Sequence, residues 1–229
     1  MSWSHPIKHL LDSPNDRFPA ASRHMRHDGL VSQRARILRL ALALMAQGGA
    51  EAMSMRDLAG AAEMNVATLY HYFPSKRDLL TAVLEEPEYR NVLDGELPGA
   101  GPGGPVDDLA QLLQESWQVM LDVQDYVRVM VGEALRGDDA ARSVGSSLLG
   151  TTEAALQQWA ADVLHERQAA RAAAIARMLR AVIVGVFIEQ LADGSDDTSW
   201  CEQRARELAP MLAGVVRREG GAPKSTHRR

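Results

Sequence analysis

The sequence predicts an all-α protein in which a compact unit of short helices precedes a bundle of longer helices. Apolar residues recur at spacings of three and four along most of the chain, as they do on one face of an α-helix. Ala, Leu and Gln, which favour helices, are abundant in the second half. No segment alternates apolar and polar residues for long, so we expect no β-sheet.

The composition limits the classes of protein that need to be considered. A chain of 229 residues with 46% hydrophobic and 24% charged residues can bury a substantial core in one or two domains. The formal net charge of -5 excludes a uniformly basic nucleic-acid packer but allows a small basic surface. Cys201 is the only cysteine, which excludes an intrachain disulfide and a thiolate zinc site. The longest apolar run, Ala181–Ile188, is far shorter than the roughly 18 residues of a membrane span. We therefore expect a cytoplasmic protein with no cofactor and no membrane partner.

The chain begins with a polar segment and a first helix. Residues 1–29 contain several prolines and no sustained periodicity, so we expect a mobile extension. Residues 30–86 should form the unit of short helices. Its first helix is predicted over Val31–Gln47, where apolar residues follow the helical period until Gly48 and Gly49 end it.

Three helix starts follow in quick succession. Ser54 with Asp57, and Ser75 with Asp78, have the spacing of a capping box, and Asn65 is a good cap between them. Starts that lie within about twenty residues leave room only for very short helices joined by tight turns. The last of these helices, beginning at Ser75, should run to about Glu86. The pattern indicates a helix-turn-helix.

The middle helix of this group has two different faces. Val66, Leu69 and Phe73 share one face and can pack against the helix before it. The opposite face carries hydroxyls, an imidazole and a methyl group, which suit phosphates and base edges in the major groove of DNA. Lys76 opens the next helix, where its ammonium group can hold a phosphate. The candidate DNA-binding residues are Ala67, Thr68, Tyr70, His71, Tyr72 and Lys76.

The segment Met55–Leu80, with the helix before it, resembles the DNA-binding domain of tetracycline-repressor (TetR) family regulators. The resemblance runs through Leu69-Tyr70-His71-Tyr72-Phe73 to Lys76, and covers roughly Arg34–Leu84. It implies that Thr68, Tyr70 and Tyr72 contact DNA and that Lys76 holds a phosphate.

One turn position departs from the family pattern, and several arginines are open to two readings. Glu63 stands where the family usually has glycine, and a positive φ there would cost about 1 kcal/mol. Arginines on the first helix can contact the DNA backbone or can form an ordinary solvated face. Those of the N-terminal extension can enter a minor groove. The arginines concerned are Arg34, Arg36 and Arg39 of the helix, and Arg23 and Arg26 of the extension.

A glycine- and proline-rich segment, Pro98–Pro105, marks the clearest break in the chain. We expect residues 87–219 to form an effector-binding and dimerisation domain and residues 220–229 to be a disordered tail. Pro210 should kink the last helix of this domain or restart it. The helices predicted after the break are Val106–Leu135, Ser143–Leu164, Glu166–Ala192 and Ser199–Arg217.

The last two of these helices carry the dimer prediction. Met178–Ile188 is apolar nearly all round, so it must be covered on two sides. Apolar residues of the final helix follow the alternating spacing of four and three that is typical of a seam between packed helices. In TetR-family proteins the last two helices of each subunit form a four-helix interface, which implies a homodimer; a central helix buried in a monomer is the alternative. The interface candidates are Leu179, Val182, Ile183, Val186, Leu208 and Leu212.

Aromatic, methionine and amide side chains earlier in this domain are typical of a pocket for an apolar ligand, although an ordinary core has the same composition. The resemblance implies a repressor that a small-molecule effector releases from a palindromic operator by shifting the population of its conformations. The effector-pocket candidates are Trp117, Met120, Gln124 and Trp159.

Two alternatives remain at this stage. The first is an all-α enzyme, but no metal-binding or nucleophile motif has a recognisable spacing, and the glycine-rich segment lacks a following Lys-Ser/Thr. The second is a helical interaction protein that does not read DNA. Salt-dependent binding to its own upstream DNA separates that alternative from a regulator.

Overall fold

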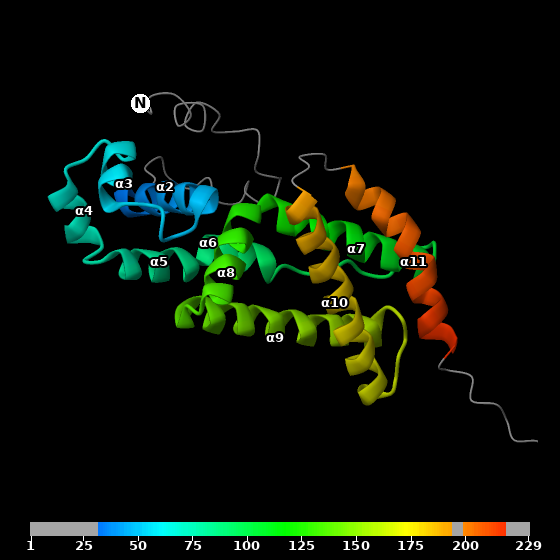
Figure 1. The fold of residues 1–229 in the computed structure, drawn as a ribbon. Helices are drawn as coiled ribbons and strands as arrows, with labels where there is room; N and C mark the ends of the chain where they lie inside the picture. The colour runs from blue at the N-terminus through cyan, green and yellow to red at the C-terminus, as the bar shows by residue number, and fades with distance from the viewer. Residues whose placement is uncertain (1–31, 194–198, 219–229) are drawn as a thin grey trace, which may run out of the picture. The chain divides into compact units, whose positions relative to one another are not determined.

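The computed structural model describes residues 32–193 and 199–218 (Figure 1). Over these ranges the chain is helical, with turns and short connections and no β-strand, which confirms the all-α prediction. None of the helices in the described part combines the length and the hydropathy needed to cross a membrane. The predictions for residues 1–29 and 220–229, with those for Arg23 and Arg26, lie outside the described residues.

The first half of the chain forms short helices close to the predicted positions. α6 was not predicted from the sequence. The helix expected to run to Glu86 ends at Leu84, and a new helix begins at Pro87. Proline lacks the amide that would continue the earlier helix, but suits the first turn of the next one. The helices are α2 (Gln33–Gly48), α3 (Met55–Ala61), α4 (Val66–Tyr72), α5 (Lys76–Leu84) and α6 (Pro87–Leu93).

The second half contains longer helices, and differs from the prediction at one break. The single helix expected over 106–135 is divided at Val123, whose φ of -121° and ψ of 28° are not helical. Pro210 lies inside the final helix, which continues past it. The helices are α7 (Pro105–Asp122), α8 (Gln124–Arg136), α9 (Asp139–Asp162), α10 (Ala169–Asp193) and α11 (Trp200–Arg218).

The described residues divide into two compact units. The first unit contains 32–91 and 122–146, and the second contains 92–121 and the described residues from 147 onward. This division differs from the predicted domain boundary after residue 86, since most of α6 and all of α8 fall in the first unit.

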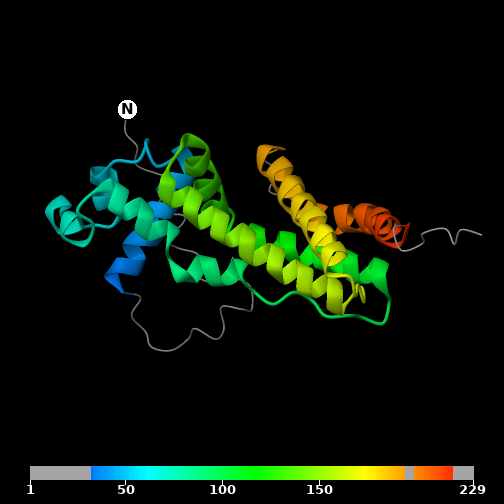
Figure 2. The same cartoon turned by 90° about the horizontal axis from the view of Figure 1, so that it is seen from below.

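The first unit is built around α2. Ile37, Ala41 and Met45 are buried on this helix, which packs against α3, α5 and α8. Leu58 of α3 and Leu79 of α5 are also fully buried. α4 packs against α3 and forms the outermost edge of this unit (Figure 2). The core therefore lies behind α4 and leaves its other face open.

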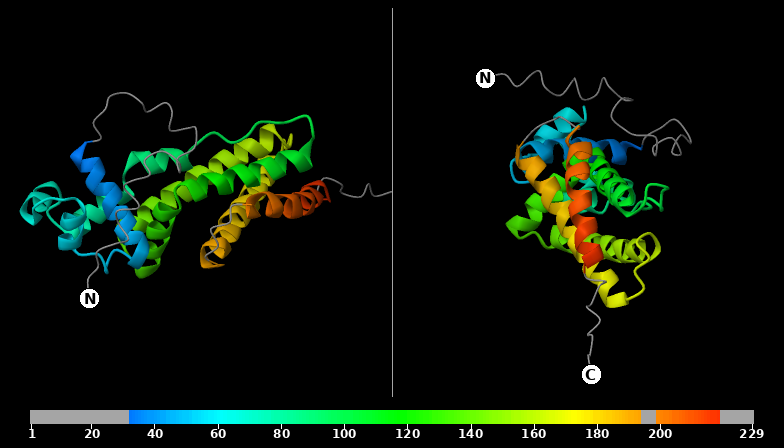
Figure 3. Two further views of the ribbon diagram at one scale, coloured as in Figure 1. Left: turned by 90° about the horizontal axis from the view of Figure 1, so that it is seen from above. Right: turned by 90° about the vertical axis from the view of Figure 1, so that its right-hand side faces the viewer.

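The second unit has a core shared by α7, α9, α10 and α11. Trp117 of α7 is fully buried, and its indole N–H donates to the Ile183 carbonyl of α10 at 2.9 Å. Arg171 near the start of α10 donates to the Val216 carbonyl near the end of α11, because these two helices lie side by side and antiparallel (Figure 3).

Candidate nucleic-acid interface

The three helix starts of the first unit have the predicted caps. The Ser54 hydroxyl accepts the Asp57 amide at 3.1 Å and donates to the Asp57 carboxylate at 2.6 Å. Ser75 makes the same pair of bonds with Asp78, at 3.1 and 2.7 Å. The Asn65 side chain accepts the Ala67 amide at 2.8 Å. These local bonds define where α3, α4 and α5 begin, and so fix the two turns between them.

One face of α4 is held inside the unit. Leu69 has no exposed surface and Phe73, immediately after the helix, is 3% exposed. They lie on the side of α4 that packs against α3, where Leu58, Ala59 and Ala62 are buried. Small side chains at two of these α3 positions allow the short helices to approach closely.

The other face of α4 is exposed, and it carries two tyrosine rings in contact with water. Tyr70 is 46% exposed and Tyr72 is 39% exposed, although the chain has only four tyrosines. His71 meets the Tyr72 ring edge-on, with 6.3 Å between the ring centroids. Ala67, Thr68 and His71 are exposed beside them. Five of the six predicted DNA-binding residues therefore share one open surface, which we call the α4 face.

Lys76, the sixth predicted residue, has a partner that the sequence did not indicate. Its ammonium group donates to the Glu51 carbonyl, in the connection between α2 and α3, at 2.7 Å. The side chain is half-buried at the first position of α5. An ammonium group has three N–H donors, so the bond to Glu51 still leaves two donors for a phosphate.

The turn between α3 and α4 contains the predicted departure. Glu63 has a φ of 54°, which lies in the left-handed region that favours glycine. The turn is closed by bonds from the Glu63 amide to the Gly60 carbonyl at 3.1 Å and from the Met64 amide to the Ala59 carbonyl at 3.0 Å. The glutamate is therefore held in a conformation that costs free energy, as the sequence suggested.

The arginines of α2 each face a carboxylate. Arg34 lies 3.7 Å from Glu86, Arg36 lies 4.0 Å from Glu63, and Arg39 lies 3.7 Å from Glu88. The Arg34 guanidinium also lies over the Phe73 ring, 5.4 Å from its centroid. These exposed ion pairs are weak, but they give the arginines a structural role that does not require DNA.

Residues 37–83, which contain these helices, match the family model described as "Bacterial regulatory proteins, tetR family". The helix-turn-helix of this chain is therefore of the TetR-family type. This is a family of DNA-binding regulators rather than enzymes, and the match coincides with the segment whose resemblance was noted from the sequence.

Relatives with assigned functions agree with this placement over the same part of the chain. The chain is 39% identical over 90 residues to the HTH-type transcriptional repressor KstR of Rhodococcus jostii, a match that covers 38% of this chain and 41% of the relative. It is 50% identical over 52 residues to KstR of Mycolicibacterium smegmatis, covering 23% of this chain and 26% of that one. The matched segments thus span less than half of the relatives' length.

Solved structures extend the likeness to most of the fold. A TetR-family transcriptional regulator from Streptomyces coelicolor superposes with a TM-score of 0.63 at 18% identity, over 84% of this chain and 85% of that one. A transcriptional regulator from Pseudomonas aeruginosa PAO1 gives a TM-score of 0.61 at 20% identity, over 85% and 98% of the two chains. At these identities the likeness concerns the fold.

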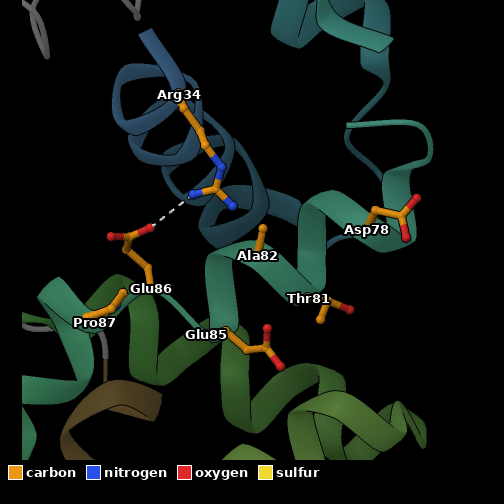
Figure 4. A pocket seen from close by; sticks show the side chains of 7 residues that line it. All are labelled: Arg34, Asp78, Thr81, Ala82, Glu85, Glu86 and Pro87. Atoms are coloured by element: carbon orange, nitrogen blue, oxygen red, sulfur yellow. Dashed lines mark ion pairs between the residues drawn. The ribbon is translucent and has the colours of Figure 1, made fainter. Parts of the chain in front are cut away.

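The first unit contains a pocket of about 310 Å³ (Figure 4). The Arg34–Glu86 ion pair lies on its wall, and Asp78 is already committed to capping α5 through Ser75. The lining has three acidic side chains, one arginine and no aromatic residue, unlike the apolar, aromatic pocket predicted for an effector. The residues that line it are Arg34, Asp78, Thr81, Ala82, Glu85, Glu86 and Pro87.

The predicted effector-pocket residues lie in two different units. Trp117 is fully buried and Trp159 is 4% exposed, and their indole N–H groups donate to the carbonyls of Ile183 and Pro98 at 2.9 and 2.7 Å. Met120 is half-buried near the end of α7, whereas Gln124 begins α8 in the first unit. The two tryptophans thus serve as packed core residues whose polar groups already have partners.

Half of the predicted dimer residues are buried inside the second unit. Leu179, Ile183 and Leu212 are buried within the single chain, and Val182, Val186 and Leu208 are half-buried. The most exposed apolar side chains on α10 and α11 are others: Ile188 at 38%, Met211 at 67% and Val215 at 49%. The sequence did not single out Met211, which is next to the seam residue Leu212 and lies about 100° from it around the helix.

Proposed function

We propose that this chain is a transcriptional regulator that binds operator DNA through the α4 face and Lys76. The observation that carries the proposal is the exposure of Thr68, Tyr70 and Tyr72 on a short, capped helix whose other side is buried. Burying an aromatic ring is stabilising, and the rings of Tyr70 and Tyr72 remain partly in water. A partner that covers them gains this stabilisation, so exposed tyrosines favour a binding surface. As a DNA-binding regulator, it acts in the cytoplasm.

The chemistry of the α4 face suits duplex DNA. The hydroxyls of Thr68, Tyr70 and Tyr72 can donate to phosphate oxygens or to acceptors on base edges. The Ala67 methyl group can contact the methyl group of a thymine, and His71 can bond a base edge. Lys76 supplies the positive charge at the start of α5, where a phosphate is also favoured by the free backbone amides.

The proposal includes a homodimer formed through α10 and α11. The apolar side chains of Ile188, Met211 and Val215 are exposed on these two helices, and a second copy of the chain can cover them. A two-fold axis through such an interface places two copies of α4 one turn of DNA apart, about 34–36 Å, on a palindromic site.

Repression and its release complete the proposal. The relatives that match the N-terminal part are repressors, which favours repression here too. A small molecule bound in the second unit would release the operator by favouring a conformation in which the two copies of α4 are misplaced. This requires that the ligand bind the two conformations with unequal affinity.

Selection from a randomised pool of duplexes tests the central claim. The full-length protein should enrich a palindromic sequence, and scrambling that sequence should cost roughly 4 kcal/mol or more in binding free energy. The affinity should also fall steeply between low and high salt, as phosphate contacts require. Failure to enrich any sequence would leave a helical interaction protein as the better description.

A further inference from the structure

α8 presents a buried face to the rest of the first unit. Tyr126, Val129 and Glu133, spaced by three and four, are 0%, 3% and 5% exposed. The two polar residues of this face lie seven positions apart, which is about 10 Å along a helix. Each of them bonds to a backbone group of another segment, so α8 is attached to the unit at two separate points.

Glu133 is the first attachment point. Its carboxylate accepts the Ala50 amide at 2.8 Å, a buried bond between residues 83 positions apart. The same oxygen accepts from the Arg136 guanidinium, also at 2.8 Å. A buried carboxylate is very unfavourable without partners, so these bonds explain why α8 can carry an acid on its inner face.

The connection between α2 and α3 fits closely around this pair. Gly49 has a φ of 84°, and a Cβ placed on it would lie 3.0 Å from the Arg136 guanidinium. Glu51, two residues on, offers its carbonyl to Lys76. Two side chains of opposite charge, Glu133 and Lys76, therefore hold the backbone of two adjacent residues, Ala50 and Glu51, in the segment that leads into α3 and α4.

Tyr126 is the second attachment point. Its hydroxyl bonds the Leu84 carbonyl, at the end of α5, at 2.6 Å. Its ring stacks on Tyr89 of α6 with 5.2 Å between centroids and an interplanar angle of 24°. α8 thus contacts the chain just before the helix-turn-helix and just after the helix that follows it.

We propose that Glu133 is a positioning residue for DNA binding, which holds the α2–α3 connection and thereby the orientation of α4. Glu133 does not belong to the α4 face, so it acts through the Ala50 amide and through Arg136 rather than by touching DNA. α8 follows α7 with a single residue between them, so Glu133 lies on the helix that the chain enters directly from the second unit. This inference rests on the proposed function and extends it to the regulation of the same site.

The experiment compares three full-length variants with the parent on the duplex that the parent selects. Glu133→Leu removes the acceptor, Glu133→Gln keeps an acceptor oxygen for Ala50, and Glu115→Leu changes an exposed acid on α7 as a control. We expect Glu133→Leu to weaken binding roughly tenfold and to speed hydrogen exchange at the Ala50 amide by a similar factor. Glu133→Gln should stay within about threefold of the parent in both measurements, and Glu115→Leu should match it.

A second variant keeps the test decisive if Glu133→Leu does not fold. Arg136→Gln should weaken binding while leaving the dependence of log affinity on log salt unchanged, since a positioning residue releases no counterions. A salt slope that falls by about one would make Arg136 a phosphate contact and overturn the proposal. So would faster exchange at Ala50 with unchanged affinity. A parent that selects no duplex would overturn the proposed function instead, while exchange at Ala50 would still report whether the contact exists.

Discussion

Glu63 adopts a backbone conformation that is unfavourable for a residue with a Cβ. Its φ of 54° suits glycine, and its side chain is 83% exposed beside Arg36 at 4.0 Å. The ion pair contributes little at such exposure, so it does not offset the cost of the conformation. The turn keeps its shape because the caps on either side and the bonds that close α3 define it.

Replacing Glu63 by glycine should stabilise the protein by about 1 kcal/mol, since glycine adopts this φ without the clash of a Cβ. Chemical denaturation at a fixed protein concentration measures the change in the free energy of unfolding. Glu63→Ala is the matched control, because it removes the carboxylate but keeps the Cβ. A glycine variant no more stable than the alanine variant would mean that this turn is not strained.

Tyr70, on the α4 face, and Lys76, at the start of α5, test the proposed DNA-binding site at single positions. Replacing either Tyr70 by alanine or Lys76 by methionine should weaken operator binding by about 1–3 kcal/mol, because each change removes a group available to DNA. The lysine variant should also lower the salt slope by about one. Fluorescence anisotropy on the selected duplex measures both quantities.

The control for these variants is Leu149→Ala, which shortens another apolar side chain, 41% exposed, in the second unit. It should bind like the parent. Far-UV circular dichroism should show unchanged helicity in all three variants. Parent-like affinity of both the Tyr70 and the Lys76 variants would remove the α4 face from the proposed site.

Cys201 gives a prediction about reactivity. It is 2% exposed, and burial raises the pKa of its thiol to about 11, from an ordinary value near 9. At neutral pH the native thiol should therefore react with a disulfide reagent far more slowly than the unfolded chain does, because the thiolate is the reactive form. Rapid, complete labelling under native conditions would contradict this burial.

The pKa of Cys201 also predicts the direction of a pH effect on stability. The unfolded thiol loses its proton first, because its pKa is lower than that of the folded state. This contribution to stability is therefore fully present below pH 9 and declines as the pH rises from about 9 toward about 11.

At the scale of the element, the sequence predicts best what is decided by residues close together in the chain. The starts of α3, α4 and α5 were predictable because each capping pair is two or three residues apart. α6 had a usable signal in Pro87, which suits a first helical turn. The break at Val123 has no comparable signal, since no glycine or proline lies there.

Pro210 allows a prediction about α11. Proline supplies no amide to the carbonyl of Arg206, four residues earlier, although the helix continues past it. Pro210→Ala should therefore stabilise the protein by about 2 kcal/mol, somewhat less than the full helix penalty of proline because the unfolded chain gains freedom.

Gly214→Ala, on the same helix, is the comparison for Pro210→Ala. No atom of the described residues lies within 4 Å of a Cβ at this position, so alanine should add about 1 kcal/mol through helix propensity alone. Thermal unfolding at one fixed protein concentration ranks the two variants. If Pro210→Ala were the less stable of the two, the proline would be part of a geometry that α11 needs.

At the scale of the whole molecule, distant contacts limit what the sequence alone can predict. The bond between Glu133 and the Ala50 amide joins residues 83 positions apart, and that between Tyr126 and Leu84 joins residues 42 apart. Helical periodicity places Tyr126 and Glu133 on one face but cannot say which segment that face meets. For this reason α8 was assigned to the C-terminal domain, whereas the structure groups it with the N-terminal helices.

The proposed dimer also concerns the whole molecule. The exposure of individual side chains within one chain indicates which substitutions test it. Ile183 is 4% exposed within one chain, so Ile183→Asp should unfold the protein. Met211 is 67% exposed, so Met211→Glu should separate the subunits without lowering helicity, and should weaken binding to a palindromic duplex.

Sedimentation and circular dichroism distinguish these two outcomes for the dimer variants. Leu135→Glu is the matched control, because Leu135 is 81% exposed in the first unit and lies outside the proposed interface. This control should remain dimeric. A Met211→Glu protein that sediments as a dimer at micromolar concentration would move the interface away from this part of α11.

The bond between Lys76 and the Glu51 carbonyl affects the entropy that the proposed DNA binding would cost. A lysine side chain that is free in water gives up about 2 kcal/mol of rotamer entropy when it is ordered. Here the folding of the first unit has already ordered much of that side chain before any duplex arrives. If Lys76 holds a phosphate as proposed, less side-chain entropy should be lost on binding, and a larger share of the attraction should remain as binding free energy.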